Sequence, residues 1–419
     1  MSQWLNEVIE SASATSDFLA PFRKQALSSL EQAGWPGRRN EAWRFTPLTS
    51  LEKREVKHVQ QAASAQPPSI EGLSAFELVF VDGKLATDTS QLATPEGVTI
   101  ASFDQLDDTQ KQAASEVFGQ IKPARHIFGL VNDIASTQGI FIDVADGVQM
   151  DQVIRVANLV TQDVDAHTRI LVRVGKGASA KIFEHAEGTV ASMSTAFSEY
   201  AIAEKGHLEH YRFAMMTGQA KQIGGTHFQL GDESTLNSTV VGYGSELSRL
   251  DVDIIHAGEH ADAKMNAVYL LAEGELFDLH SNIEHTVPNG TTEENARGIV
   301  GDRARAVFNG RIHIHRDAQN TLAELNNRNL LLSRRGIINT KPELEIYADD
   351  VKCAHGATVA EIDEEALFYL LTRGVNRSKA LVMLNFGFIQ ELVNKMPDAA
   401  IRQWLLPKLN DRFAQMEVK

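Results

Sequence analysis

From about residue 76 to about residue 357 the chain is a long succession of short β-branched runs divided by turn residues. Typical runs are GVTIASF, GIFIDVA, QVIRVANLV and RILVRVGKG, and proline is very scarce among them. Such runs predict β-strands, and few helical patterns lie between them. About 280 residues of strands exceed one ordinary sandwich. The sequence therefore favours a large sandwich, a propeller or a solenoid.

A repeat of nearly constant length bears on this choice. The elements GASAKIFEH, GHLEHYRF, GDESTLNSTVV and GEHADAKMNAV begin at Gly177, Gly206, Gly231 and Gly258, in steps of 29, 25 and 27 residues. A period of this size fits one coil of a β-solenoid that stacks on the next coil. Turn glycines are common in all β-proteins, so the repeat alone does not exclude a sandwich. The WD and kelch signatures of propellers are absent.

Helical patterns flank the strand-rich region. Residues 1 to about 60 carry apolar residues at helical spacing, for example Leu5, Val8 and Ile9. The polar segment QQAASAQPPSIEG that follows is typical of a linker. These changes in residue pattern predict an N-terminal helical domain with linker over 1–72, a β core over 73–357 and a C-terminal helical domain over 358–419.

Three amphipathic helices are predicted after the core. The first spans Asp363 to Arg373, with acidic residues in its first turn and Gly374 directly after its end. The second spans Arg377 to Met396, and the third begins near Asp398 and is interrupted at Pro407. Three such helices predict a small bundle or a platform that docks a partner.

Composition excludes several classes of function. The chain has 40 basic and 55 acidic residues, a formal net charge of −15, which argues against nucleic acid as the main partner. Its single cysteine excludes an internal disulfide and any zinc or iron–sulfur site that draws four cysteines from this chain alone. The motifs GxxxxGK[ST], HExxH and GxSxG are absent, so the chain is not itself a P-loop ATPase.

Signals for export or membrane insertion are also missing. The N-terminus, MSQWLNEVIESASATSDFL, lacks a basic region followed by a long apolar one, so a secretory signal is not expected. The longest apolar stretches, such as Ala267 to Ala272, are too short to cross a bilayer. The expected location is the cytoplasm, or an organelle stroma if a transit peptide has been removed.

The segment LEIYADDVKCAHGATV contains the most suggestive constellation. It places Cys353 two residues before His355, and residues i and i+2 of a strand project from the same face. The pair could act as two ligands for iron or zinc, or as a thiol beside a base that lowers its pKa. A small buried cysteine near a packing histidine is the simpler alternative.

Other polar groups have a simpler interpretation. In RIHIHR, Arg311, His313 and His315 share one strand face, which could be a metal face, an anion patch or, more simply, a solvated strand face. Asp251 and Asp253 share a strand face, as glycosidase carboxylates of a β-helix would, and a solvated face is again the simpler prediction. The same holds for Glu273/Glu275. The pairs His207/His210, His256/His260 and His280/His285 are expected to be structural or surface residues.

Two parts of the sequence resemble a known family. LEIYADDVKCAHGATV, followed by DEEALFYLLTRGV, closely resembles the C-terminal signature of the SufB/SufD family of iron–sulfur cluster assembly proteins. GWPGRRNEAWRFTPL, residues 34–48, resembles a segment typical of the SufD branch. Members of the SufB branch are usually longer and carry additional cysteines. This chain has neither feature, so the SufD branch is the better match.

The resemblance implies a mainly β fold, with a right-handed parallel β-helix core between helical domains. It implies a non-enzymatic scaffold subunit of the SUF machinery that pairs with SufB through the ends of the β-helix cores. The C-terminal helices would dock the ABC-type ATPase SufC. The family's interface cysteine and histidine map onto Cys353 and His355. These residues would hold iron or a nascent iron–sulfur cluster shared with SufB, with none tightly bound by this chain alone.

Two alternatives remain open at this stage. One is a homo-oligomeric structural β-solenoid, because the same β-helix end could pair with a second copy as a homodimer when SufB is absent. A carbohydrate-active β-helix enzyme would use the carboxylate pairs, but such enzymes are often secreted and need a long aromatic groove. The missing signal and an aromatic content of only 7% argue against it.

Overall fold

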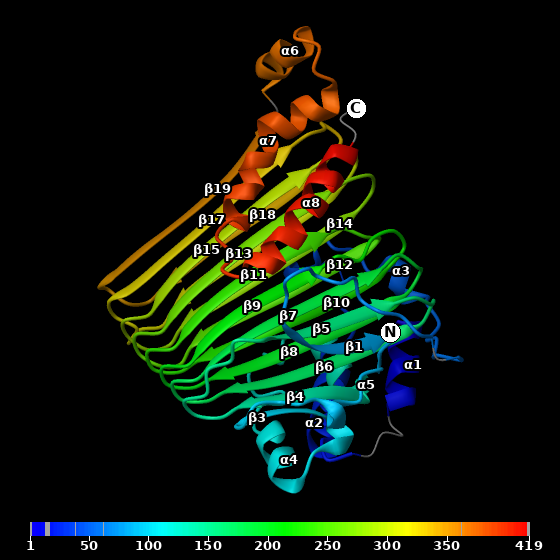
Figure 1. Cartoon of the computed structure of the whole chain (residues 1–419), viewed down its shortest axis with the longest axis vertical. Coiled ribbons are helices and arrows are strands. Elements are labelled where there is room, and N and C mark those ends of the chain that lie inside the picture. The colour runs from blue at the N-terminus through cyan, green and yellow to red at the C-terminus, as the bar shows by residue number, and fades with distance from the viewer. Residues whose placement is uncertain (1, 13–16, 38, 62, 362, 417–419) are drawn as a thin grey trace.

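The computed structural model of the chain is a parallel β-solenoid with helices at both termini (Figure 1). It describes residues 2–12, 17–37, 39–61, 63–361 and 363–416. Strands two apart in the sequence pair in parallel, so each coil contributes one strand to each of two sheets. The predicted mainly β solenoid is confirmed, and neither a propeller nor a sandwich has this pairing.

The two sheets divide the strands into odd-numbered and even-numbered members, except for the early strands β2 and β3. We call them sheet A and sheet B. In hydrogen-bonded order, the described strands of sheet A are β19 Val351–Glu361, β17 Thr321–Leu331, β15 Thr291–Val300, β13 Asp262–Leu271, β11 Thr235–Tyr243, β9 His207–Ala214, β7 Ser179–Gly188, β5 Val153–Val160, β1 Ala75–Val81 and β2 Lys84–Leu85. Those of sheet B are β18 Ile337–Ile346, β16 Arg305–Ile314, β14 Leu276–His285, β12 Leu247–His256, β10 Lys221–Leu230, β8 Met193–Ile202, β6 Asp165–Val174, β4 Gln138–Val144 and β3 Val98–Ser102.

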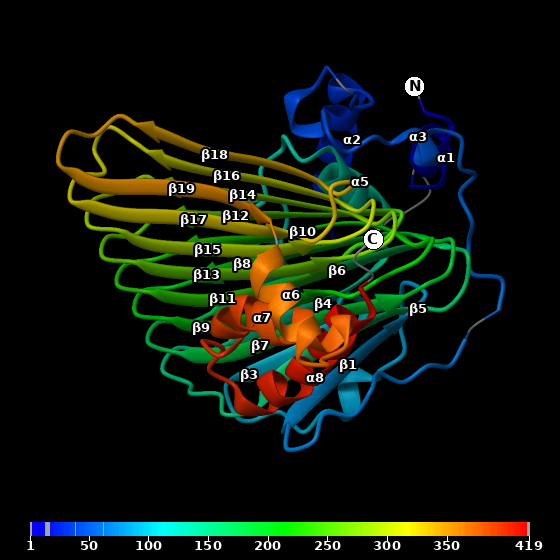
Figure 2. The ribbon, with the colours of Figure 1, turned by 90° about the horizontal axis from the view of Figure 1, so that it is seen from above.

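The helices lie outside these sheets. They are α1 Gln3–Ala12, α2 Ala20–Ala33, α3 Thr49–Glu52, α4 Asp108–Ser115, α5 Ile127–Ala135, α6 Glu364–Thr372, α7 Arg377–Val393 and α8 Ala399–Gln415, with 3-10 turns at Glu41–Trp43, Thr89–Gln91 and Phe103–Gln105. Figure 2 shows the N-terminal and C-terminal helices on opposite sides of the solenoid.

The sequence repeat corresponds to the coils. Its four elements form β7, β9, β11 and β13, which are consecutive neighbours in sheet A. Ser179 lies opposite His207, His207 opposite Thr235, and Thr235 opposite Asp262, so equivalent positions are 28, 28 and 27 residues apart.

The corner before each of these strands repeats one backbone conformation, although only the first of the corners compared next has a glycine at that position. Gly177, Lys205 and Glu233 adopt φ values of +60°, +56° and +54°, and each backbone N–H donates to a carbonyl in the corner of the next coil. This left-handed backbone favours glycine. At Gly258 the cause is close stacking, because a Cβ there would lie 2.0 Å from the nitrogen of Asp232.

Three apolar clusters hold the layers together. The main core fills the space between the two sheets, with Ile182, Tyr200, Leu279 and Phe308 among its fully buried members. The N-terminal helices and α5 pack on the outer face of sheet B. Helices α7 and α8 pack on the outer face of sheet A, against β13 and β15. The C-terminal helices therefore form a layer on the solenoid as well as contacting each other.

Three local predictions differ from the structure. Helices α4 and α5 interrupt the region predicted to be strands, because Asp107 and Gln110 form a capping box and the apolar residues of α5 follow helical spacing. Strand β19 continues to Glu361, beyond the predicted end of the core at 357. Pro407 does not interrupt the third C-terminal helix, since α8 runs through it with its apolar face buried on both sides of the proline.

A carboxyl group in the solenoid interior predicts a pH dependence of stability. Glu294 is fully buried, accepts a hydrogen bond from Ser281 Oγ at 2.6 Å, and its Oε2 has no partner among the described residues. Burial raises the pKa of this carboxyl from 4.5 to about 7, against the opposing effect of the Ser281 hydrogen bond.

Because the folded-state pKa is raised, the folded state binds the proton more tightly than the unfolded state does. Stability should fall by on the order of 1–3 kcal/mol as pH rises through this window, from about 4.5 to about 7. Urea unfolding across this range should show a weaker loss in Glu294→Gln. An unchanged pH profile in that variant would contradict the assignment.

Candidate functional site

The solenoid has an open end at its C-terminal side. Strands β18 and β19 are the last members of their sheets, and each pairs with another described strand on one side only. Apolar side chains are exposed along and beside these edges, including Ile337, Ile346, Tyr347 and Val359. Such an edge offers unpaired backbone groups to another chain. The opposite end differs, because its sheets finish in the short antiparallel strands β2 and β3.

Cys353 and His355 lie on β19, at this open end. In the parallel register Cys353 is opposite Ala323 and His355 opposite Leu325, and both partners belong to the buried core. The two predicted site residues therefore face the interior side of the last coil. Cys353 is half-buried and packs against the core, whereas His355 is exposed.

The surroundings of Cys353 do not activate its thiol. Burial raises the pKa of the Cys353 thiol, and a hydrogen bond with the Ala323 backbone acts in the opposite direction. A protonated thiol is a poor nucleophile, so the interpretation as a thiol with a lowered pKa has no support here. What remains is one sulfur and one imidazole on a common face. Two ligands do not complete a zinc or cluster site.

The groups of three or more potential metal ligands in the described residues lie elsewhere. One consists of Glu284 on β14 together with His313 and His315 of the RIHIHR segment. Arg311 lies among them: it donates to both oxygens of Glu345 at 2.8 and 2.7 Å, and its Nη2 is 2.9 Å from His313 Nδ1. The guanidinium takes the place that a cation would need. The half-buried, ion-paired face agrees with the simple interpretation of a polar strand face.

The second group includes Asp253, and the burial of this residue shows that one sequence prediction was wrong. Asp251 and Asp253 were expected on a solvated strand face, but both are buried. Asp253 accepts from Arg125 and lies 2.7 Å from His126 Nε2. These two partners precede α5 and are far away in the sequence, so no local pattern on β12 could reveal the burial. Arg249 pairs with Asp251 at 2.8 Å. Carboxylates held in this way do not form a free glycosidase pair.

The remaining candidates are structural. Glu275 is bound by Arg412 of α8 at 2.6 Å. His256 and His285 are buried, and their rings stack at 4.0 Å across neighbouring strands. His207 Nδ1 lies 2.6 Å from Thr235 Oγ1. These placements agree with the structural roles expected for the histidine pairs, although the sequence did not pair His256 with His285.

The C-terminal helices present an exposed apolar patch. We define it by Phe368, Tyr369, Met383 and Leu384, which are 67%, 55%, 58% and 37% exposed. Helix α6 projects beyond the last strands, while α7 leads back along the solenoid (Figure 1). Exposed apolar side chains of this size are common at interaction sites.

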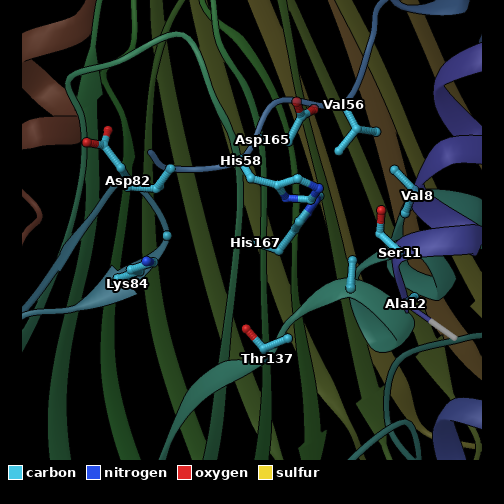
Figure 3. Close-up of a pocket in the computed structure, with 13 residues that line it drawn as sticks. Val8, Ser11, Ala12, Val56, His58, Asp82, Lys84, Thr137, Asp165 and His167 are labelled. Carbon is cyan, nitrogen blue, oxygen red and sulfur yellow. The ribbon is translucent and has the colours of Figure 1, made fainter. Parts of the chain in front are cut away.

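A cavity of about 330 Å³ lies between α1 and the first coils, with His58, Asp165 and His167 around it (Figure 3). Several of its polar groups already have partners. Asp165 accepts from Trp4 Nε1 at 2.7 Å and from the Lys57 backbone at 2.7 Å. Burial lowers the pKa of His167 to about 4, so its ring is neutral. These contacts attach the N-terminal segment to the solenoid.

Among the described helices, none is long and apolar enough to span a bilayer.

Comparison with known proteins identifies the family. Residues 158–388 match the family model described as "SUF system FeS cluster assembly, SufBD core domain", and residues 5–156 match "SufBD protein N-terminal region". The iron–sulfur cluster assembly protein SufD of Escherichia coli is 28% identical over 94% of this chain and 93% of its own length.

Two further relatives cover similar shares. A SufBD family protein of Synechocystis is 28% identical over 93% of this chain and 90% of its own length. The chloroplastic protein ABCI7 of Arabidopsis thaliana is 26% identical over 96% and 88%. The core model alone spans more than half of the sequence. The chain therefore belongs to the SufBD family of SUF-system iron–sulfur cluster assembly proteins.

Proposed function

We propose that this chain is a scaffold subunit that pairs with SufB through its open solenoid end and docks the ATPase SufC on its C-terminal helices. The observation that carries the proposal is the open end itself. It combines two unpaired strand edges, exposed apolar side chains and an inward-facing Cys353–His355 pair. A second solenoid stacked on this end would continue both sheets and enclose the pair.

The site is then a half-site completed by the partner. His355 supplies an accessible imidazole, and Cys353 supplies a thiol that would be deprotonated on binding a metal. Imidazole and thiolate suit iron and nascent clusters, which are the cargo of the family and not a resident cofactor. Enclosure between two solenoids would also protect a thiol and its cluster from oxidation.

The C-terminal helices would pass movement of the ATPase to this end. Arg297 on β15 donates to the backbone oxygen of Phe388 at 2.6 Å and to Glu391 at 2.8 Å, both on α7. β15 is separated from β19 by β17 alone. When bound ATP draws two SufC subunits together, the helices would pull on the last coils, twist the junction with SufB and open the enclosed site.

Anaerobic co-purification with SufB and SufC tests this function. The wild-type chain should form a stable complex with both partners, and the isolated chain should form a homodimer that SufB dissolves. Iron content and visible absorption report the cargo. Failure of the chain to copurify with either partner would overturn the assignment. Persistence of the homodimer with SufB in excess would instead identify a self-assembling structural solenoid.

A further inference from the structure

A second ligand cluster lies on the outer face of sheet B, where β14 and β16 separate β12 from the last strand, β18. It borders a cavity of about 310 Å³ whose walls include Arg125, His126, Arg249, Asp251 and Asp253. His126 is the residue directly before α5. The cluster therefore lies where the N-terminal helical layer meets the solenoid.

Two imidazoles converge there on one carboxylate oxygen. Asp253 Oδ2 lies 2.7 Å from His126 Nε2 and 2.8 Å from His227 Nδ1. One donor atom from each of the three residues falls within 4.8 Å of the others. The residues come from the segment before α5, from β10 and from β12, and His227 is directly opposite Asp253 in the strand register.

The ring of His227 is held in place by its surroundings. It stacks on Phe197 with planes 8° apart. Gly225 leaves the space for it, because a Cβ there would lie 2.5 Å from His227 Nε2. His227 and Asp253 are almost fully buried, so neither ligand needs to be ordered on binding. Such preorganisation favours a metal site over an accidental surface cluster.

We propose that His126, His227 and Asp253 bind a divalent transition-metal ion of the zinc or ferrous class. Two imidazole nitrogens and one carboxylate oxygen are a ligand set that such ions prefer, and the cavity supplies an open position for water. Asp251 Oδ1 lies 3.7 Å from His126 Nδ1, beyond direct hydrogen-bond distance, on the side of the ring away from the proposed metal. The ion would join α5 to β10 and β12.

Two features set limits on the affinity. Arg125 pairs with the other oxygen of Asp253, but its side chain is 48% exposed and can turn into solvent. Binding through Nδ1 of His227 moves the ring proton to Nε2, which is buried without a partner among the described residues. Both features weaken metal binding. The first predicts that a substitution beside the site can raise the affinity for the metal ion. Removal of Arg125 should tighten the site.

The experiment uses the purified full chain and Co²⁺ as a spectroscopic probe, with Zn²⁺ as competitor. One equivalent of Co²⁺ should give a visible spectrum of nitrogen and oxygen ligation, which Zn²⁺ abolishes. His126→Gln and Asp253→Asn should each weaken binding roughly 10–100-fold. Arg125→Gln should tighten it about tenfold. His315→Gln, in the Arg311-blocked cluster, is the matched control and should bind like the wild type.

A stability measurement keeps the test independent of folding defects. Saturating Zn²⁺ should raise the Tm of the wild type and of His315→Gln, but not that of Asp253→Asn, whose fold is checked by circular dichroism. Equal Co²⁺ binding by all variants, or loss of binding in His315→Gln alone, would overturn the proposal. So would weaker binding in Arg125→Gln. The measurement needs no SufB, so its failure leaves the proposed function untouched.

Discussion

His355→Ala is expected to lower the iron retained by the complex with SufB and SufC roughly tenfold or more, while all three proteins still copurify. The imidazole is exposed on the inward face of the last strand, so its removal takes away the proposed ligand without creating a core cavity. The measurement is iron and acid-labile sulfide per complex after anaerobic reconstitution, together with the visible spectrum.

The same strand provides matched controls. Lys352 is exposed on the opposite face of β19, so Lys352→Ala should leave the iron content unchanged. Cys353→Ala should have a smaller effect than His355→Ala, because the thiol is half-buried and its pKa is raised. Full cluster assembly by the complex that contains His355→Ala would show that His355 is not a ligand of the proposed half-site. An equal loss of iron in Lys352→Ala would indicate that the substitutions disrupt strand β19 and not a specific ligand.

Met383→Asp is expected to weaken SufC binding by on the order of 100-fold while SufB pairing persists. Met383 is 58% exposed in the apolar patch of α6 and α7. Burying a side chain of this kind contributes about 1.5–3 kcal/mol, and placing a carboxylate in the same contact adds a desolvation cost. About 3 kcal/mol corresponds to two orders of magnitude in Kd.

Titration of SufC onto the preformed pair with SufB gives this Kd directly. Asn410→Asp adds a negative charge at an exposed position of α8, outside the apolar patch, and should bind SufC normally. Phe368→Asp, on α6, should reproduce the defect of Met383→Asp. Unchanged SufC affinity in both patch variants would place the ATPase on another surface.

The residue pattern alone left a large sandwich, a propeller or a solenoid open, and the family resemblance implied the β-helix that the structure shows. Among the repeat glycines, Gly177 has the left-handed backbone, whereas Gly206, Gly231 and Gly258 lie where coils stack closely. Equivalent corner positions recur every 27 or 28 residues. Elsewhere in the same corner Lys205 and Glu233 adopt the left-handed backbone without being glycine. The repeat was therefore visible but irregular.

The site could be predicted only in part. The spacing of Cys353 and His355 placed both on one face of a strand, and the register of β19 confirms that face. That the strand is the last of its sheet depends on the absence of a further coil, which no local pattern encodes. The burial of Asp253 depends on His126, 127 positions earlier in the chain. Contacts at such separations follow from the fold and not from periodicity.

The difference between the two ends of the solenoid limits how far these molecules can associate. One end finishes in the short antiparallel strands β2 and β3, and the other in the long parallel strands β18 and β19. A coil stack with two bare ends would add copies without limit and grow into fibres. If only the end with the long parallel strands stacks on a partner, as we propose, each molecule is monovalent, and the first partner that it binds terminates growth. Synthesis in excess of SufB should therefore produce closed pairs and not filaments.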